Sequence, residues 1–299
     1  MASIKDLKKR IGTVKNTQQT TKAMKMVSTA KLRRAQEAVR AHRPYAKEIQ
    51  SLIELASSAE SAAAVKSPLL RRAGESVEGQ SSVLLVVVTS DRGLCGGFNG
   101  NVIRAAQRWL EVNRANYDRV ELGCVGKRGY DFFRGRGRTI GFHFPEFGGK
   151  VTYSIAKKVA GELIKLFESG KYTEVHFVYN EFKNAGIQTP VSERFLPVEG
   201  KTQDGSATSG QVEMIKPSAT EVLELLLRKN FAAQAYRVLL ESQAGEHGAR
   251  MTAMSNATDN AGDMIRMLTL EYNKQRQAGI TKELLEIISG SESQKSAQA

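Results

Sequence analysis

"KNTQQTTKAMKMVSTAKLRRAQ", residues 15–36, contains neither glycine nor proline, and most of its residues tolerate helical dihedral angles, so it predicts a helix. From Leu7 to Gln36 the chain has nine lysines or arginines and no acidic residue. Ordinary surface helices mix the two signs, because opposite charges three or four positions apart attract each other. A helix that carries only positive charge raises the question of what it faces.

The same stretch lies inside a heptad pattern that runs from Ile4 to Ala56. Its steps alternate between three and four, which gives a left-handed supercoil with a partner helix. The seam consists of Ile4, Leu7, Ile11, Val14, Gln18, Thr21, Lys25, Ser28, Leu32, Ala35, Val39, His42, Ala46, Ile49, Ile53 and Ala56. It is apolar at both ends and polar from Gln18 to Ser28, which fits a helix that is contacted on several sides. Pro44 is expected to kink this helix rather than to end it.

A second heptad pattern occupies the other end of the chain. It predicts a helix over 218–289 that pairs antiparallel with the N-terminal helix over 1–57, and overhangs it because it is longer. Its seam consists of Val222, Leu226, Lys229, Ala233, Tyr236, Leu240, Gln243, His247, Arg250, Met254, Ala257, Ala261, Met264, Leu268, Glu271 and Gln275. The polar tail 290–299 is expected to be disordered.

The end of this second helix, "AGITKELLEIISG", is more apolar than a free helix end should be. Five large aliphatic residues fall within nine positions: Ile280, Leu284, Leu285, Ile287 and Ile288. They either pack on their own domain or fit a socket on another protein.

The middle of the chain has a different character. The run from Val83 to Thr89 is apolar on both faces, which is typical of a buried parallel strand, and a glycine turn and a helical stretch follow it. Strand and helix patterns then alternate, so we predict a doubly wound, Rossmann-like α/β domain over 81–200. A linker over 58–80 and a polar loop over 201–217 are expected on its two sides.

The charge of the chain is unevenly distributed. The net charge is +13, yet residues 1–47 alone hold 13 lysines and arginines against two acidic residues. Residues 210–299 hold ten basic and eleven acidic residues. A local excess of this kind predicts an acidic partner, which could be nucleic acid, anionic lipid or an acidic protein surface.

Composition narrows the class of protein. The 299 residues are 41% hydrophobic, so a packed core is expected and global disorder is not. No apolar run reaches about 18 residues, and the N-terminus lacks the pattern of a signal or transit peptide. We expect a cytoplasm-like compartment, and we interpret Cys95 and Cys124 as reduced, structural residues.

The glycine turn after the first strand invites a nucleotide-binding interpretation, because such turns present backbone N–H groups to phosphate. Its glycines are Gly93, Gly96, Gly97 and Gly100. Their spacing matches neither the dinucleotide nor the P-loop motif. Asp91 lies at the carboxyl end of the strand, where α/β folds bind ligands, but a lone acidic residue is a weak signal and a tight structural turn is the simpler interpretation.

Other chemistry is equally sparse. The four histidines have no metal-ligand spacing, and His42 and His247 fall on the heptad seams, where buried polar residues are expected to set the register. We therefore expect no catalytic residue, no metal and no cofactor. Two alternatives stay open: an α/β nucleotide-binding enzyme, and a basic coiled-coil nucleic-acid-binding protein, although no aromatic residue precedes Tyr45 to stack on bases.

Three blocks carry a resemblance to a known family. "NTQQTTKAMKMVSTAKLRRAQ", "TSDRGLCGGFNGNV" and "ATDNAGDMIRMLTLEYNKQRQAGITKELLEIISG" resemble the signature blocks of the gamma subunits of F-type ATP synthases, in the same order and along essentially the whole chain. The resemblance implies a non-catalytic rotor shaft that couples proton flow to ATP synthesis or hydrolysis. It also implies alpha, beta and epsilon subunits and the membrane ring of c subunits as partners. The implied location is peripheral, on the cytoplasmic face of a bacterial membrane.

The resemblance also implies partner contacts at particular residues. Met24 and Lys25 match the place where acidic loops of the beta subunits press on the shaft. Ile280, Leu284 and Ile288 match the part of the shaft that sits in the apolar sleeve of the alpha–beta hexamer.

Arg250, Gln277 and Thr281 match positions that contact a further beta-subunit loop. Chloroplast members of the family carry an extra segment with a regulatory cysteine pair. Nothing similar lies between Pro190 and Lys216, so thiol control is not expected.

Overall fold

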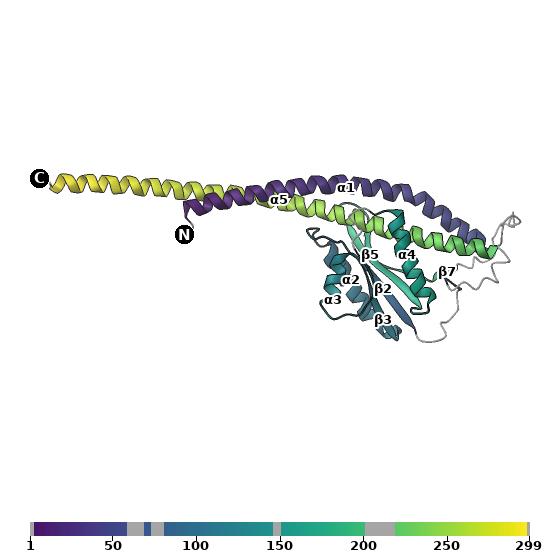
Figure 1. Cartoon of the computed structure of the whole chain (residues 1–299). Helices are drawn as coiled ribbons and strands as arrows, with labels where there is room; N and C mark the ends of the chain where they lie inside the picture. Colours follow the sequence, from purple (N-terminus) through teal and green to yellow (C-terminus); the bar gives the residue numbers. More distant parts are fainter. Residues whose placement is uncertain (1–2, 59–68, 73–80, 146–150, 201–218, 298–299) are drawn as a thin grey trace. The chain divides into compact units, whose positions relative to one another are not determined.

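Two long helices form the two ends of the chain (Figure 1). In the computed structural model, α1 spans Ile4–Ser58 with 55 residues and α5 spans Ala219–Ala297 with 79 residues. The structure describes residues 3–58, 69–72, 81–145, 151–200 and 219–297. The polar loop expected over 201–217 lies outside these residues.

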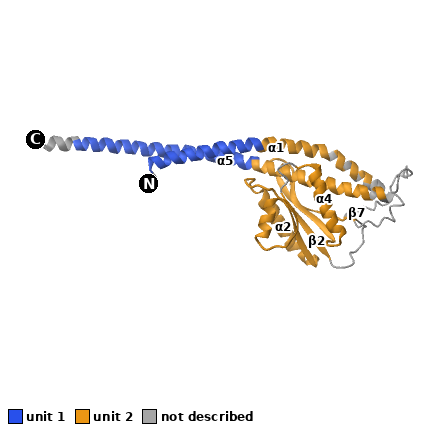
Figure 2. Ribbon diagram, viewed as in Figure 1, with its two compact units in different colours: residues 1–27, 251–299 blue, residues 28–250 orange. Residues whose placement is uncertain are grey.

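The chain divides into two compact units (Figure 2). Unit 1 consists of residues 1–27 and 251–299, and unit 2 consists of residues 28–250. Both α1 and α5 contribute a segment to each unit.

The first turn of α1 is closed by a capping box. The backbone N–H of Asp6 donates to the Ser3 hydroxyl at 3.2 Å, and the backbone N–H of Ser3 donates to the Asp6 carboxylate at 3.3 Å. This reciprocal pair satisfies helix-end donors that would otherwise lack partners. Further along, α1 continues through Pro44 without ending there.

Within unit 1, the two helices run antiparallel, as the heptad patterns predicted. Ile4 at the start of α1 lies against Gly279 of α5, and the hydroxyls of Thr21 and Thr258 are 2.8 Å apart. Residue numbers therefore rise along α1 as they fall along α5. This pairing confirms the coiled-coil part of the predicted fold.

The burial of α1 follows the predicted seam. Its buried residues, among those that the structure describes, are Leu7, Thr21, Ser28, Leu32, Ala35, His42 and Ile49, and each is a seam position. The polar part of the seam is satisfied internally. The Gln18 amide donates to the Thr258 carbonyl at 3.4 Å, and the Lys25 ammonium donates to the Ser255 hydroxyl at 2.9 Å. The polar gap thus accommodates hydrogen bonds to α5, and the contacts on further sides that the sequence suggested stay a prediction.

The seam predicted for α5 is partly wrong. Met264 and Glu271 are exposed, whereas the neighbouring Ile265 and Tyr272 are half-buried. Apolar residues at adjacent positions allow two heptad registers here. The register that the structure adopts is the one that turns Ile265 toward α1.

The central sheet has five strands in the order β4-β3-β2-β5-β6. Its strands are β2 (Ser82–Val88), β3 (Arg119–Val125), β4 (Ile140–Phe144), β5 (Glu174–Phe182) and β6 (Gln188–Leu196). The first four are parallel and β6 is antiparallel to β5. This mixed, mainly parallel order is that of a doubly wound fold, as predicted.

Helices cover both faces of the sheet (Figure 1). They are α2 (Phe98–Asn113), the short 3-10 helix η2 (Arg114–Asn116), α3 (Lys127–Arg134) and α4 (Tyr153–Glu168). On β2, Leu85 and Val87 pack with residues of α2 and α3, whereas Leu84, Val86 and Val88 pack with residues of α4 and α5. The α5 segment of unit 2 is therefore part of the domain core, and this explains why β2 is apolar on both faces.

Two expectations at the edges of the domain require correction. The predicted linker contains a short strand, β1 (Leu70–Arg72), which pairs in parallel with β7 (Val198–Gly200). The tail expected to be disordered after Gly290 continues α5 as far as Ala297. Three-residue strands leave no periodic signal, and the tail contains no proline that would end a helix.

A buried acidic group stabilises the start of β3. The Glu121 carboxylate accepts hydrogen bonds from the Tyr172 hydroxyl and the Arg119 guanidinium, and the Lys171 ammonium lies 3.3 Å from it. Burial raises the pKa of Glu121, but these partners outweigh it and hold the pKa below its ordinary value. A Cβ on Gly141 would overlap both the carboxylate and the Tyr172 hydroxyl.

We expect two glycine-to-alanine substitutions to have opposite signs. Gly141→Ala drives a methyl group into the buried Glu121–Tyr172 pair and should destabilise the chain by about 2 kcal/mol or more. Gly161→Ala, in α4, meets no atom within 4 Å and should stabilise it by up to about 1 kcal/mol. Thermal denaturation of both variants measures the difference. Equal melting temperatures would contradict the packing described around Glu121.

Candidate partner-contact surfaces

Met24 and Lys25 lie at the edge of the α1–α5 contact in unit 1. Both side chains are half-buried, and the Lys25 ammonium is hydrogen-bonded to Ser255. The side chains that stand fully outward here are their neighbours Met26 and Val27, which are 61% and 56% exposed. These two residues are not among the contacts predicted from the sequence. Their place off the heptad seam was the signal that could have identified them.

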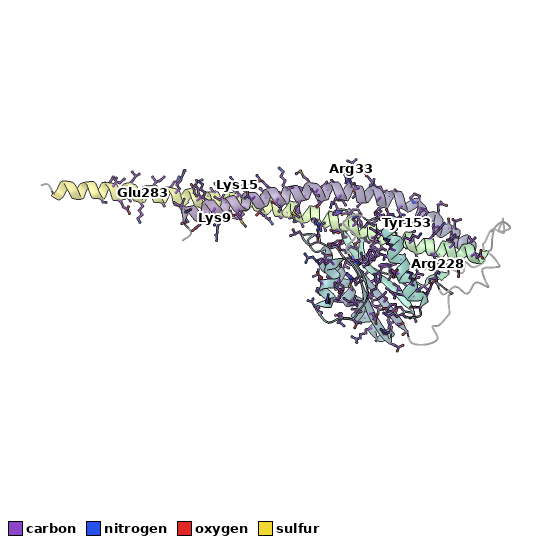
Figure 3. The ribbon with its side chains drawn as sticks, in the orientation of Figure 1. Lys9, Lys15, Arg33, Tyr153, Arg228 and Glu283 are labelled. Atoms are coloured by element: carbon purple, nitrogen blue, oxygen red, sulfur yellow. The ribbon has the colours of Figure 1, made fainter. Side chains whose placement is uncertain are left out.

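The outer face of α1 in unit 1 is strongly positive. Figure 3 labels two of its lysines, Lys9 and Lys15. The exposed cations are Lys5, Lys8, Lys9, Arg10, Lys15 and Lys22. Within the part of the chain that the structure describes, no carboxylate lies within ion-pair distance of these six. The charge excess is therefore available to a partner.

The apolar end of α5 is exposed to solvent. Because Ile4 begins α1 beside Gly279, α5 continues past it as a single helix, and every residue from 280 to 290 is exposed. The large aliphatic side chains here are 50–68% exposed: Ile280, Leu284, Leu285, Ile287 and Ile288. Gln277 and Thr281 are exposed on the same stretch. Within unit 1, these side chains are not buried against another segment of the described chain.

Arg250 is placed differently from the other candidate residues. It belongs to unit 2 and only 9% of its surface is exposed. Its guanidinium lies 2.7 Å from the Glu246 carboxylate and donates to the Gly93 carbonyl at 3.2 Å. The structure therefore groups Arg250 with the glycine turn, and not with Gln277 or Thr281.

Burial shifts the pKa values of the ionisable groups around Arg250. Burial, together with the charges of Arg250 and Lys31, lowers the pKa of His247 to about 4. Burial also raises the pKa of Glu246, although Arg250 opposes that change. His247 is thus neutral near pH 7, and its ring nitrogen lies 3.4 Å from the Arg250 guanidinium. His42, on the other predicted seam, is also buried and lies 3.0 Å from the Ala233 carbonyl.

Buried residues of the chain lie beside the point of the sheet where an α/β fold binds nucleotides: Phe98 begins α2 after β2, and its carbonyl accepts a hydrogen bond from the Asn180 amide of β5. In this sheet the strand order reverses between β2 and β5, and ligands bind at that point in related folds. The buried Phe98 ring lies there, and a Cβ on Gly245 of α5 would be 3.1 Å from it. Asp91 accepts a hydrogen bond from the backbone N–H of Lys127, at the first residue of α3. The glycine turn is therefore structural, and the geometry does not favour a nucleotide-binding enzyme.

Two further features bear on function. Among the described residues, no cluster of histidine, cysteine or acidic side chains could hold a metal ion. None of the helices in the described ranges combines the length and apolarity that crossing a membrane requires. The fold and these surfaces define a class of protein in which two paired terminal helices accompany an α/β domain and carry exposed charged and apolar surfaces.

Comparison with known proteins identifies the family. A family model described as ATP synthase matches residues 3–293. The ATP synthase gamma chain of Anaeromyxobacter sp. is 46% identical over 99% of this chain and 100% of its own length. That of Geobacter sp. (strain M21) is 47% identical over 98% of this chain and 99% of its own length. The chain belongs to the ATP synthase gamma-chain family.

Solved structures agree with this assignment. The central stalk and c-ring structure of the Tetrahymena thermophila mitochondrial ATP synthase contains a chain that is 25% identical, with a TM-score of 0.61. That match covers 80% of this chain and 99% of the other. A chain of the Euglena gracilis mitochondrial ATP synthase has the same fold, with a TM-score of 0.68 over 99% of this chain and 96% of the other at 20% identity.

The buried His247 should make stability depend on pH. Its folded-state pKa lies below the unfolded value of about 6.5, so the unfolded chain binds the proton more tightly. This group therefore lowers the free energy of unfolding as the pH falls from about 6.5 to about 4, by roughly 3 kcal/mol in total.

His247→Gln should remove that dependence. Denaturant unfolding at several pH values compares the two proteins, and Glu246 titrates in both, so their difference isolates the imidazole. Parallel stability profiles between pH 4 and 6.5 would show that His247 is not buried as a neutral group.

Proposed function

We propose that this chain is the central-stalk rotor subunit of an F-type ATP synthase. In that role it turns inside a hexamer of alpha and beta subunits and couples transmembrane proton flow to ATP synthesis or hydrolysis on the beta subunits. It supplies no catalytic residue and no cofactor site itself. Its further partners are the epsilon subunit and the ring of c subunits, and its location is peripheral, on the cytoplasmic face of a bacterial membrane.

The observation that carries this proposal is the exposed apolar end of α5 in a member of the gamma-chain family. A broad exposed face of aliphatic side chains lowers the solubility of a helix unless another protein covers it. The five aliphatic side chains form one broad face of the helix, opposite Lys282, Glu283 and Glu286, and such a face fits the apolar wall of a sleeve. We propose that Ile280, Leu284 and Ile288 sit in such a sleeve of the hexamer, and that Gln277 and Thr281 contact a beta-subunit loop beside it.

The positive face of α1 supports the second part of the proposal. Met24 and Lys25, with the exposed Met26 and Val27, are the surface on which acidic beta-subunit loops press. Exposed ion pairs contribute only about 0–1 kcal/mol each, so many of them can guide a shaft without locking it at one angle. The angle of the shaft then stabilises different beta conformations at different positions, which is coupling in the thermodynamic sense.

Co-expression with the alpha and beta chains of a close relative tests the proposal. We expect a stable complex that contains one copy of this chain. The double variant Leu284→Asp/Leu285→Asp should bind the hexamer at least tenfold more weakly, because each buried leucine contributes about 1.5–3 kcal/mol. Its own fold should be unchanged, since both side chains are exposed. Glu283→Gln, an exposed substitution on the same stretch, is the matched control and should bind like the wild type. Recovery of hexamers without the wild-type chain would count against the rotor assignment.

Met24→Lys should disturb coupling more than assembly. The new ammonium adds a fixed charge opposite acidic loops, so one rotor angle becomes too stable relative to the others. ATP-driven proton pumping, divided by the ATPase rate of the same vesicles, should fall below the wild-type ratio. Met24→Leu keeps the volume without the charge and should leave the ratio unchanged. An unchanged ratio in Met24→Lys would rule out this surface as the place of contact.

A further inference from the structure

The turn between β2 and α2, residues 90–97, combines two unfavourable features at Leu94. Its φ angle is +61°, and no other non-glycine residue within the described ranges has a positive φ. Its side chain is 64% exposed, so its burial within the chain does not offset this strain. Bulky residues rarely adopt this conformation, and where they do, the surrounding structure fixes it, often at a functional element.

Hydrogen bonds within the turn constrain its two ends. The backbone N–H of Ser90 donates to the Asn99 side chain at 2.9 Å, and the Ser90 hydroxyl donates to the Arg92 carbonyl at 2.6 Å. The Asn99 amide lies 3.2 Å from the sulfur of the buried Cys95. These contacts fix the ends of the turn, but none of them reaches the peptide group that joins Gly93 to Leu94.

Arg250 reaches that peptide group from α5. Its Nη2 donates to the Gly93 carbonyl at 3.2 Å, and that carbonyl lies in the peptide plane whose orientation sets φ of Leu94. Glu246, one helical turn before it, holds the other side of the guanidinium at 2.7 Å. The neutral His247 borders the same guanidinium and adds no competing charge. The buried arginine is thus held in place by α5 and aimed at the strained part of the turn.

The surroundings of Leu94 indicate what it would contact. Arg92 and Arg128 are both exposed, and the Arg128 guanidinium passes within 3.0 Å of where a Cβ on Gly93 would lie. An exposed apolar side chain in a turn that also carries the exposed Arg92, with the Arg128 guanidinium beside the preceding Gly93, complements a small apolar socket with carboxylates at its rim.

We infer that Arg250 is a positioning residue: it fixes the Gly93–Leu94 peptide plane and so presents Leu94 as a rigid apolar contact to an acidic-rimmed socket on a partner subunit. The inference rests on the proposed function and changes one part of it. The direct contact with a beta-subunit loop expected of Arg250 is replaced by an action through Leu94.

Hydrogen exchange of the full chain without partners tests the positioning role. Arg250→Ala should increase exchange in the peptide that covers residues 90–98 by about tenfold to a hundredfold, the range expected when a charged donor is lost from a buried bond. The double variant Arg250→Ala/Glu246→Gln should show the same increase in exchange as Arg250→Ala alone. Agreement between the two would show that the increase comes from loss of the bond to Gly93, and not from the carboxylate that Arg250→Ala leaves unpaired. Arg237→Ala removes another partly buried arginine of α5, one bonded to Tyr179 and Glu193, and should leave the turn unchanged. Wild-type exchange of the turn in Arg250→Ala would overturn the inference.

A double-mutant cycle in the assembled complex tests the contact. Leu94→Asn keeps a residue that tolerates positive φ but removes the apolar side chain, and should lower the ratio of proton pumping to ATPase rate at least twofold. Val112→Asn, at a side chain that is 70% exposed on α2, is the control and should have no effect. Adding Arg250→Ala to Leu94→Asn should change the ratio little further, because both act through one contact.

Additive effects would show that Arg250 meets the partner directly, and would overturn the inference. The two experiments separate this failure from failure of the proposed function. If the chain assembles with no hexamer, the exchange of the turn still reports whether Arg250 positions Leu94.

Discussion

The antiparallel contact between α1 and α5 is the constraint on which the rest of the structure depends. A helix with nine basic and no acidic residues over thirty positions repels itself, because like charges one turn apart are destabilising. Pairing along the heptad seam offsets that cost in both units. In unit 1 it leaves the cations outward, and in unit 2 it packs α5 onto the sheet, so the same helix is half of a coiled coil and part of a domain core.

The polar centre of the seam shows how the contact between α1 and α5 can fix one alignment of the two helices without a large apolar area. Apolar seams tolerate shifts in register, whereas a buried polar residue is stable only opposite its own partner. Thr21 meets the Thr258 hydroxyl and Lys25 meets Ser255, so a shift by one heptad would leave these groups without hydrogen bonds. The residues that weaken the seam in hydrophobic terms therefore fix the alignment of the two helices.

Sequence periodicity predicted the buried residues correctly where a helix has a single apolar face. It failed where apolar residues occupy several faces of the helix. It identified every buried residue of α1 in the described part of the chain, and the strand–helix order of the domain. It failed in α5 after Ala261, because Met264, Ile265 and their neighbours satisfy two registers, and only contact with α1 selects one. It also missed the short strands β1 and β7, whose pairing joins residues far apart in sequence. Periodicity also could not predict the burial of Arg250, because arginine is rarely buried without partners that only the folded chain brings together.

The distribution of strength along the molecule accounts for how such a subunit can turn and still transmit force. Unit 2 is held by apolar clusters on both faces of its sheet and by ion pairs such as Glu246 with the buried Arg250, which break only at considerable cost. The surfaces that we propose for partners use two weaker kinds of interaction: exposed cations whose attraction falls with salt, and aliphatic side chains whose contacts are non-directional. Strong directional bonds across those surfaces would stop rotation at one angle, and weak bonds inside the domain would absorb the torque. Strong, directional interactions therefore lie inside the domain, where they resist torque, and weak, non-directional interactions lie on the surfaces proposed for partners, where they permit rotation.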